Sequence, residues 1–126
     1  MAKNLKEKKH TLFASFKCAF RGVGEAWISE KSLRIHFYLA FLVIILGFIF
    51  QISRTEWLFI TMIIALVLTT EMVNTAVEKI LDLVCKEANG EVRFIKDLFA
   101  AIVLIAALGS LIIGAIIFIP KIAVLF

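Results

Sequence analysis

The sequence predicts an all-α integral membrane protein in which an amphipathic surface helix precedes three transmembrane helices. Of its 126 residues, 62% are hydrophobic, and the mean hydropathy is +1.00. A soluble domain carries about 45–50% apolar residues, and a domain this small buries too little surface to hide the excess. The apolar residues also gather into three long stretches. This composition argues against a soluble monomer and against a disordered chain, which needs low hydrophobicity.

The N-terminal element, at about residues 8–28, has the spacing of an amphipathic helix. At 100° per residue its apolar side chains fall within an arc of about 120°. They are Leu12, Phe13, Phe16, Ala19, Phe20, Val23 and Trp27. Lys17, Arg21 and Glu25 line up on another side, one turn apart. Directly before membrane spans, this pattern favours a helix lying in the membrane surface, although soluble core helices and calmodulin-type target helices share it.

Three apolar stretches follow, each close to the roughly 20 residues needed to cross the hydrocarbon core. We expect spans at about residues 35–52, 57–82 and 97–119, the last one closed by Pro120. The N-terminal segment, the two connections and the C-terminal tail carry eight, one, four and one Lys or Arg residues. By the positive-inside rule, this alternation places the N-terminus in the cytoplasm and the C-terminus outside.

The second span carries polar residues where hydrocarbon is expected. Glu71, Asn74, Thr75, Glu78 and Asp82 recur at intervals of three or four residues and so share one helix face. Ionisable groups inside a span are costly and indicate a function or a partner. Because this helix runs toward the cytoplasm, Glu78 and Asp82 should lie near its exit, with Glu71 about 10 Å deeper.

Charged residues at the starts of the first and third spans should meet this stripe at the same membrane face. They are Glu30, Arg34, Lys96 and Asp97. The carboxylates of Glu30 and Glu78 suit Mg²⁺, which commonly takes one or two carboxylates together with substrate phosphates. Glu71 could accept a proton from an alcohol, and a lysine beside a helix N-terminus favours phosphate. These are the parts of phosphoryl transfer, although the chain has no P-loop or protein-kinase motif.

The stripe and two further segments together carry a recognisable signature. Glu71-Met-Val-Asn-Thr-Ala-Val-Glu78-Lys-Ile-Leu-Asp82 resembles the E-x-x-N-[ST]-A-[IV]-E-x-x-x-D motif of the small bacterial diacylglycerol kinase and undecaprenol kinase family. Lys96-Asp97 resembles that family's Lys-Asp pair at the start of its last span. Trp27-Ile-Ser-Glu30 with Leu33-Arg34 is similar to its W-I-x-E-x-x-[FL]-R segment. The match covers about residues 12–120.

The resemblance implies a homotrimer of three-span subunits in a bacterial cell membrane, with active sites between neighbouring subunits at the cytoplasmic face. It implies ATP and Mg²⁺ as co-substrate and metal, a membrane lipid alcohol as acceptor, and no nucleic acid. Glu71 would be the catalytic proton acceptor, and Glu30 and Glu78 would hold the metal on the phosphates. The remaining implied contacts are Glu87, Asn89, Lys96 and Asp97 to the nucleotide, and Trp27, Arg34 and Asn74 to the lipid.

Other positions distinguish branches of that family. Cys18 stands where a tyrosine near the nucleotide is usual, Thr11 replaces an arginine, and His36 replaces an acid of the proteobacterial enzymes. The strings Arg34-Ile-His36 and Phe118-Ile-Pro120-Lys121 resemble the undecaprenol kinase branch of Gram-positive bacteria. We therefore predict phosphorylation of undecaprenol to undecaprenyl phosphate. Diacylglycerol, giving phosphatidic acid, is the alternative acceptor.

Two readings from other functional classes compete with the kinase. A small multidrug-type transporter with an intramembrane glutamate is similarly short, but such chains usually have four spans and need polar groups on both sides of the midplane. A structural protein would use Asn74 and its neighbours only to join helices, with Glu30, Lys96 and Asp97 as ordinary charges at helix starts. Cation uptake without ATP hydrolysis would favour the transporter.

Overall fold

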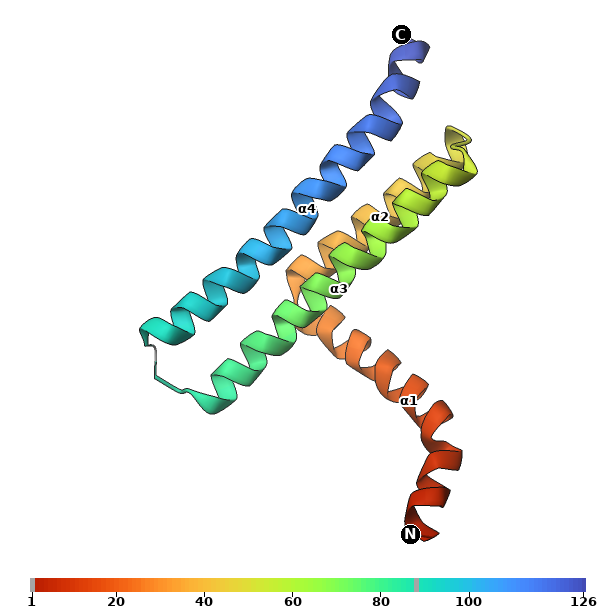
Figure 1. Cartoon of the computed structure of the whole chain (residues 1–126). Helices are drawn as coiled ribbons and strands as arrows, with labels where there is room; N and C mark the ends of the chain where they lie inside the picture. The colour runs from red at the N-terminus through yellow and green to blue at the C-terminus, as the bar shows by residue number, and fades with distance from the viewer. Residues whose placement is uncertain (1, 88) are drawn as a thin grey trace.

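The computed structural model describes residues 2–87 and 89–126, and for residues 2–10 it describes the backbone only. This part of the chain is all-helical, with α1 (Ala2–Ser29), α2 (Lys31–Ile49), α3 (Arg54–Val84) and α4 (Gly90–Leu125). Helices α2, α3 and α4 run antiparallel in one bundle, and α1 leaves it obliquely (Figure 1). The predicted fold class, an N-terminal helix before three membrane-spanning helices, is confirmed.

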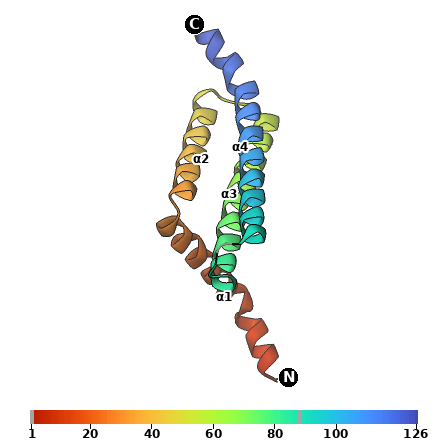
Figure 2. The same ribbon diagram turned by 90° about the vertical axis from the view of Figure 1, so that its left-hand side faces the viewer.

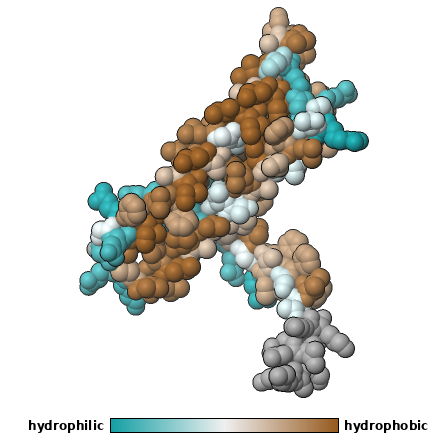
Figure 3. Space-filling view, viewed as in Figure 1, coloured by the Kyte–Doolittle hydropathy of each residue, from teal (hydrophilic) through white to brown (hydrophobic). Residues whose placement is uncertain are grey.

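The three bundle helices are long and apolar enough to cross a membrane. The 19 residues of α2 cover about 29 Å, close to the ~30 Å hydrocarbon core. Helices α3 and α4 have 31 and 36 residues and continue past the N-terminal end of α2 (Figure 1). Apolar side chains form a broad belt between polar groups at the two ends of the bundle (Figure 3). The chain is therefore a multi-pass membrane protein.

Helix α4 does not end where the sequence indicated. It continues through Pro120 to Leu125, whereas the sequence analysis closed the last span at Ile119. Proline removes one helical hydrogen bond and crowds the preceding turn, and within a helix this commonly produces a bend. The last turns of α4 are tilted relative to the rest of the helix (Figure 2). Lys121 holds these turns to α3, because its Nζ donates to Glu56 Oε2 at 3.0 Å.

The α2–α3 turn lies at the end of the bundle opposite α1. Ser53 caps α3: its Oγ accepts the Glu56 N–H at 3.2 Å, and its own N–H donates to Glu56 Oε1 at 2.9 Å. This reciprocal pair is a capping box. Ile52 and Ile60 pack with Ile117 of α4 in the core beneath the turn. The turn, the start of α3 and the end of α4 are thus joined by both polar and apolar contacts.

Gly47 allows α2 to approach Trp57 of α3 closely. A Cβ at this position would lie 2.6 Å from Trp57 Cη2 and 3.1 Å from Ile52 Cδ1. The indole also packs on Phe48, with ring centroids 4.9 Å apart, so it has little room to retreat. We expect Gly47→Ala to lower the free energy of unfolding by about 1–3 kcal/mol, the usual cost of overpacking. Unfolding of the purified protein in detergent micelles measures this loss.

Gly109 of α4 provides the matched control for that substitution. A Cβ there would meet nothing within 4 Å, and alanine is the better helix former. Gly109→Ala should therefore leave stability unchanged or raise it slightly. Equal losses in the two variants would contradict a specific close contact at Gly47.

Helix α1 meets the bundle only near its C-terminal end (Figure 1). It contacts α2 and α3, and within the described part of the chain it does not contact α4. Its large apolar side chains at Leu12, Phe13, Phe16 and Phe20 are all more than half exposed. An uncovered apolar face is the property expected of a helix that lies in a membrane surface.

Candidate active site

Glu71 is the buried acidic residue around which the candidate site is built. Only 5% of its surface is exposed. Ser32 Oγ and His36 Nε2 each lie 3.0 Å from the same carboxylate oxygen, Oε1. Ser32 and His36 are four residues apart and so share one face of α2. Because an ionised carboxylate only accepts hydrogen bonds, both act as donors to it.

The two oxygens of the Glu71 carboxylate differ in their surroundings. Within the described residues Oε2 accepts no hydrogen bond, and it is not completely buried. Asn74 Oδ1, on the next turn of α3, is completely buried and has no hydrogen-bond partner among the described residues. Buried acceptors in proteins usually have a donor. The site thus combines an accessible carboxylate oxygen with a buried amide oxygen that has no donor in the described part of the chain.

His36 and Ser32 are site residues that the sequence analysis did not identify. His36 was noted only as a branch difference, and Ser32 was given no role. The signal available was a polar pair at i and i+4 in the opening turns of an apolar span, which would share one face of the helix. That spacing could not reveal that Glu71 is the group they face, because this depends on the register between α2 and α3.

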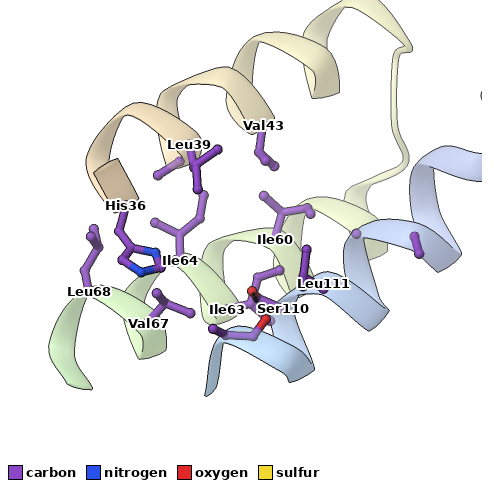
Figure 4. Close-up of a pocket in the computed structure, with 14 residues that line it drawn as sticks. His36, Leu39, Val43, Ile60, Ile63, Ile64, Val67, Leu68, Ser110 and Leu111 are labelled. Atoms are coloured by element: carbon purple, nitrogen blue, oxygen red, sulfur yellow. Dashed lines mark hydrogen bonds between the residues drawn. The ribbon is translucent and has the colours of Figure 1, made fainter. Parts of the chain in front are cut away.

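His36 also lines an apolar groove among α2, α3 and α4. The groove has a volume of about 490 Å³, and its lining is apolar except at His36 and Ser110. Figure 4 shows the imidazole of His36 reaching from α2 toward α3, near Val67 and Leu68. One side chain therefore contacts both the buried carboxylate and the apolar groove.

Trp27, Glu30 and Arg34 lie together at the corner between α1 and α2. Arg34 Nη1 donates to the carbonyl oxygens of Trp27 and Ile28 at 2.8 Å each, and these bonds satisfy carbonyls in the last turn of α1. The Trp27 indole packs edge-on against two aromatic rings of α2, with centroids 5.4 Å apart in each case. Glu30 is the N-cap of α2, but its side chain makes no capping hydrogen bond. Its carboxylate is therefore not engaged in capping α2.

The residues expected to contact the nucleotide lie at the α3–α4 end of the bundle. Lys96 Nζ donates to Asp82 Oδ1 at 3.1 Å, an exposed pair that contributes little stability by itself. Asn89 caps α4 through its Oδ1, which accepts the Val92 N–H at 2.8 Å, and its Nδ2 lies 3.1 Å from Cys85 Sγ. The side chains of Glu87 and Asp97 are exposed.

The antiparallel register orders these groups along the bundle axis. Glu71 is level with Ser32 and His36 of α2. At 1.5 Å per residue, Glu30 and Glu78 lie about 6 Å and about 10 Å farther toward the α3–α4 end, and the Asp82–Lys96 pair about 16 Å farther. Glu71 is also level with the opening turns of α2, at the edge of that span. The groups thus form an elongated series.

One chain does not bring the whole series into contact. Glu30 lies at the α1–α2 corner, whereas Lys96 and Asp97 belong to α4, and in the described part of the chain no Cα atom of α1 or α2 comes within 8 Å of a Cα atom of α4. Cys18 is exposed on α1, and Thr11 is exposed on the same helix, so both also lie away from α4. Within one chain, the residues that were expected to converge are therefore divided between the α1–α2 corner and the α3–α4 end of the bundle.

The carboxylates do not form a preformed metal cage. Among the described residues there is no group of three or more His, Cys, Asp or Glu side chains placed to hold a metal ion. Mg²⁺, however, binds through one or two carboxylates plus waters and substrate phosphates rather than in an all-protein cage. Glu30 has no capping bond and Glu78 lies on the face of Glu71, so this pair fits a metal that arrives with phosphates.

Comparison with known proteins decides the family. Residues 17–118 match the family described as prokaryotic diacylglycerol kinase. The chain belongs to this family. Undecaprenol kinase of Bacillus subtilis (strain 168) is 33% identical over 120 residues, covering 95% of this chain and 98% of the relative. Diacylglycerol kinase of Synechocystis sp. (strain ATCC 27184 / PCC 6803 / Kazusa) is 28% identical over 121 residues, covering 95% and 69%.

Membership in the prokaryotic diacylglycerol kinase family confirms the resemblance seen in the motifs. It makes the chain a membrane lipid kinase, an enzyme that transfers a phosphoryl group to a lipid alcohol. The transporter and structural-protein readings are thereby set aside. The family alone does not distinguish the acceptor, because the two relatives are named for different lipids.

Proposed function

We propose that this protein transfers the γ-phosphoryl group of ATP to the hydroxyl of undecaprenol, with Mg²⁺, to give undecaprenyl phosphate. The observation that carries the proposal is the buried Glu71 carboxylate, held through Oε1 with Oε2 accessible. The choice of acceptor is supported by the relative named undecaprenol kinase, which aligns over 95% of the chain. The strings Arg34-Ile-His36 and Phe118-Ile-Pro120-Lys121, which resemble the undecaprenol kinase branch, are consistent with that choice.

In this proposal Glu71 acts as the general base. The lipid hydroxyl gives its proton to Oε2 of Glu71 as its oxygen attacks the γ-phosphorus of ATP. A new bond forms between the lipid oxygen and phosphorus, and the bond from phosphorus to the β–γ bridging oxygen breaks, which releases ADP. The hydroxyl of a lipid at the edge of the span needs to enter no deeper than the opening turns of α2, where Glu71 lies.

Glu30 and Glu78 are the residues we propose to hold Mg²⁺ on the phosphates. The metal would supply charge neutralisation for the triphosphate. Lys96, Asp97, Glu87 and Asn89 would contact the rest of the nucleotide, at the far end of the elongated series. That order suits an extended ligand whose terminal phosphate lies nearest the base. Asn74 would contact the reacting groups through the oxygen that has no donor in the described part of the chain.

Trp27 and Arg34 would border the lipid site at the α1–α2 corner. Arg34 already fixes that corner through two carbonyl groups, and its remaining N–H groups could contact a phosphate or a lipid headgroup. The apolar groove that begins at His36 has the chemistry needed by the chain of a lipid alcohol. Both features support a lipid acceptor rather than a soluble one.

We also propose a homotrimer in the plasma membrane with the N-terminus in the cytoplasm. Within one chain, Glu30 lies at the α1–α2 corner and Lys96 on α4, and no Cα atom of α1 or α2 comes within 8 Å of a Cα atom of α4 in the described part. Packing between subunits would be one way to complete the site. The distribution of Lys and Arg supports the cytoplasmic placement of the N-terminus.

A direct comparison of acceptors tests the proposed substrate. Purified protein in mixed micelles is supplied with radiolabelled ATP, Mg²⁺ and either undecaprenol or diacylglycerol at the same mole fraction. We expect labelling of undecaprenol to be at least about ten times faster, a difference of about 1.4 kcal/mol in transition-state binding. Faster labelling of diacylglycerol would reverse the choice of acceptor, and labelling of neither would contradict the kinase assignment at this site.

A further inference from the structure

We infer that His36 is a positioning residue that holds the Glu71 carboxylate so that Oε2 receives the proton of the lipid alcohol. The inference rests on the proposed function, because it assumes that Glu71 is the general base. Its basis is the contact of 3.0 Å between His36 Nε2 and Glu71 Oε1, together with the equally short contact from Ser32 Oγ to the same atom.

The two contacts restrict the terminal torsion of the Glu71 side chain. The terminal torsion of a glutamate is broad and nearly two-fold, so an unheld carboxylate exchanges its two oxygens. Here Ser32 and His36 are one turn apart on a single helix and converge on Oε1. Oε2 is then left as the oxygen that is accessible and has no donor in the described part of the chain. The carboxylate presents one defined oxygen.

Of the two donors, His36 is the more restrictive. The Ser32 hydroxyl can rotate to other acceptors, whereas an imidazole N–H points along a direction set by the plane of the ring. That ring is also largely buried, with 21% of the side-chain surface exposed, and it lies beside Val67 and Leu68 (Figure 4). Removing the imidazole would therefore release the carboxylate and also open the end of the groove next to it.

His36 acts on the chemical step and not on the binding of nucleotide. Lys96 and Asp97, the proposed nucleotide contacts, lie about 16 Å away along the bundle axis. Losing the imidazole should lower kcat and leave KM for ATP unchanged, because a misplaced base affects the transition state alone. A general loss of packing would be expected to change both values.

Three substitutions on α2 test this role in the full-length protein. His36→Leu removes the donor, and we expect kcat to fall about 100-fold, the effect of a small misplacement of a catalytic group. His36→Gln carries an amide Nε2 the same number of bonds from Cα, so it should recover kcat to within about tenfold of the wild type. Phe41→Leu is the matched control on an exposed position of the same helix, and its kcat should stay within about twofold of the wild type.

Nuclear magnetic resonance supplies a readout that does not depend on turnover. The chain has two histidines, His10 and His36, so protein labelled with ¹⁵N-histidine gives two imidazole spin systems. We expect the Nε2-bound proton of His36 to exchange slowly in the wild type and to lose that protection in Glu71→Leu, with His10 as the reference.

The outcomes separate this inference from the proposed function. If His36→Leu retains wild-type kcat while Glu71→Gln is inactive, the inference is wrong and the base assignment stands. An imidazole signal that does not respond to Glu71→Leu also overturns the inference. If Glu71→Gln itself turns over normally, the proposed function fails, whatever the His36 variants do.

Discussion

Replacing Glu71 by glutamine is expected to lower turnover by about 10²- to 10⁴-fold, the range supplied by a general acid or base. The substitution is nearly isosteric, and the amide oxygen can still accept from Ser32 and His36 as Oε1 does. What the variant lacks is an oxygen able to take up a proton. Radiolabelled phosphoryl transfer to the lipid, measured at saturating ATP, gives the loss in kcat.

Two companion measurements show whether that loss is chemical. Binding of a non-hydrolysable ATP analogue to Glu71→Gln should match the wild type within about twofold, since the proposed nucleotide contacts lie beyond Glu71, toward the α3–α4 end of the bundle. Glu71→Asp keeps the carboxylate but withdraws it from α2 by one methylene. Its activity should therefore fall between that of the wild type and that of Glu71→Gln. Unchanged turnover in purified Glu71→Gln would contradict the assignment of this residue as the general base.

The second large effect is expected at Glu78. Glu78→Gln removes one of the two carboxylates proposed to hold Mg²⁺, and we expect activity at low Mg²⁺ to fall by about 10- to 100-fold. Because mass action can offset weaker metal binding, part of the activity should return as Mg²⁺ is raised. The initial rate is measured at fixed ATP over a series of Mg²⁺ concentrations. Enzyme with an excess of chelator gives the rate without metal.

Glu91→Gln is the matched control for this titration. Glu91 is an exposed acid in the first turn of α4, at the same end of the bundle, and carries no proposed ligand role. Glu91→Gln removes one negative charge, as Glu78→Gln does, but it should leave the Mg²⁺ dependence of the rate unaltered. If both variants shift the titration alike, Glu78 acts through the general field and not as a ligand.

Much of the fold could be predicted because membrane helices follow simple rules. Hydrocarbon forces each spanning segment to satisfy its own backbone groups, so long apolar stretches become helices. The starts of helices were harder to place. Lys31 to Arg34 form the opening turn of α2 although two of the four carry charge, because polar ends of a helix can extend beyond the hydrocarbon. Pro120 was predicted to end the last helix because proline is known to destabilise the interior of a helix. The Lys121–Glu56 contact that holds the following turn joins residues far apart in the sequence, so it could not be predicted.

The candidate site divides in the same way. Glu71, Asn74 and Glu78 could be placed on one face from their spacing alone, since helical periodicity is local. Their motif also carried the family resemblance, which comparison confirmed. Arg34 was expected at the lipid site, but its contacts to the Trp27 and Ile28 carbonyls depend on the angle between α1 and α2. No periodicity within one helix reports such an angle.

The amino-acid sequence was sufficient for three properties that arise within one helix or from the solvent around it. These properties are the number of spans, the polar face of α3 and the family motif. The pairing of Ser32 and His36 with one oxygen of Glu71 belongs to the packed bundle. That pairing depends on the register between α2 and α3, which the close approach of Gly47 to Trp57 also fixes. The register is settled by side chains far apart in sequence, and this register is what makes a buried glutamate a held and directed carboxylate.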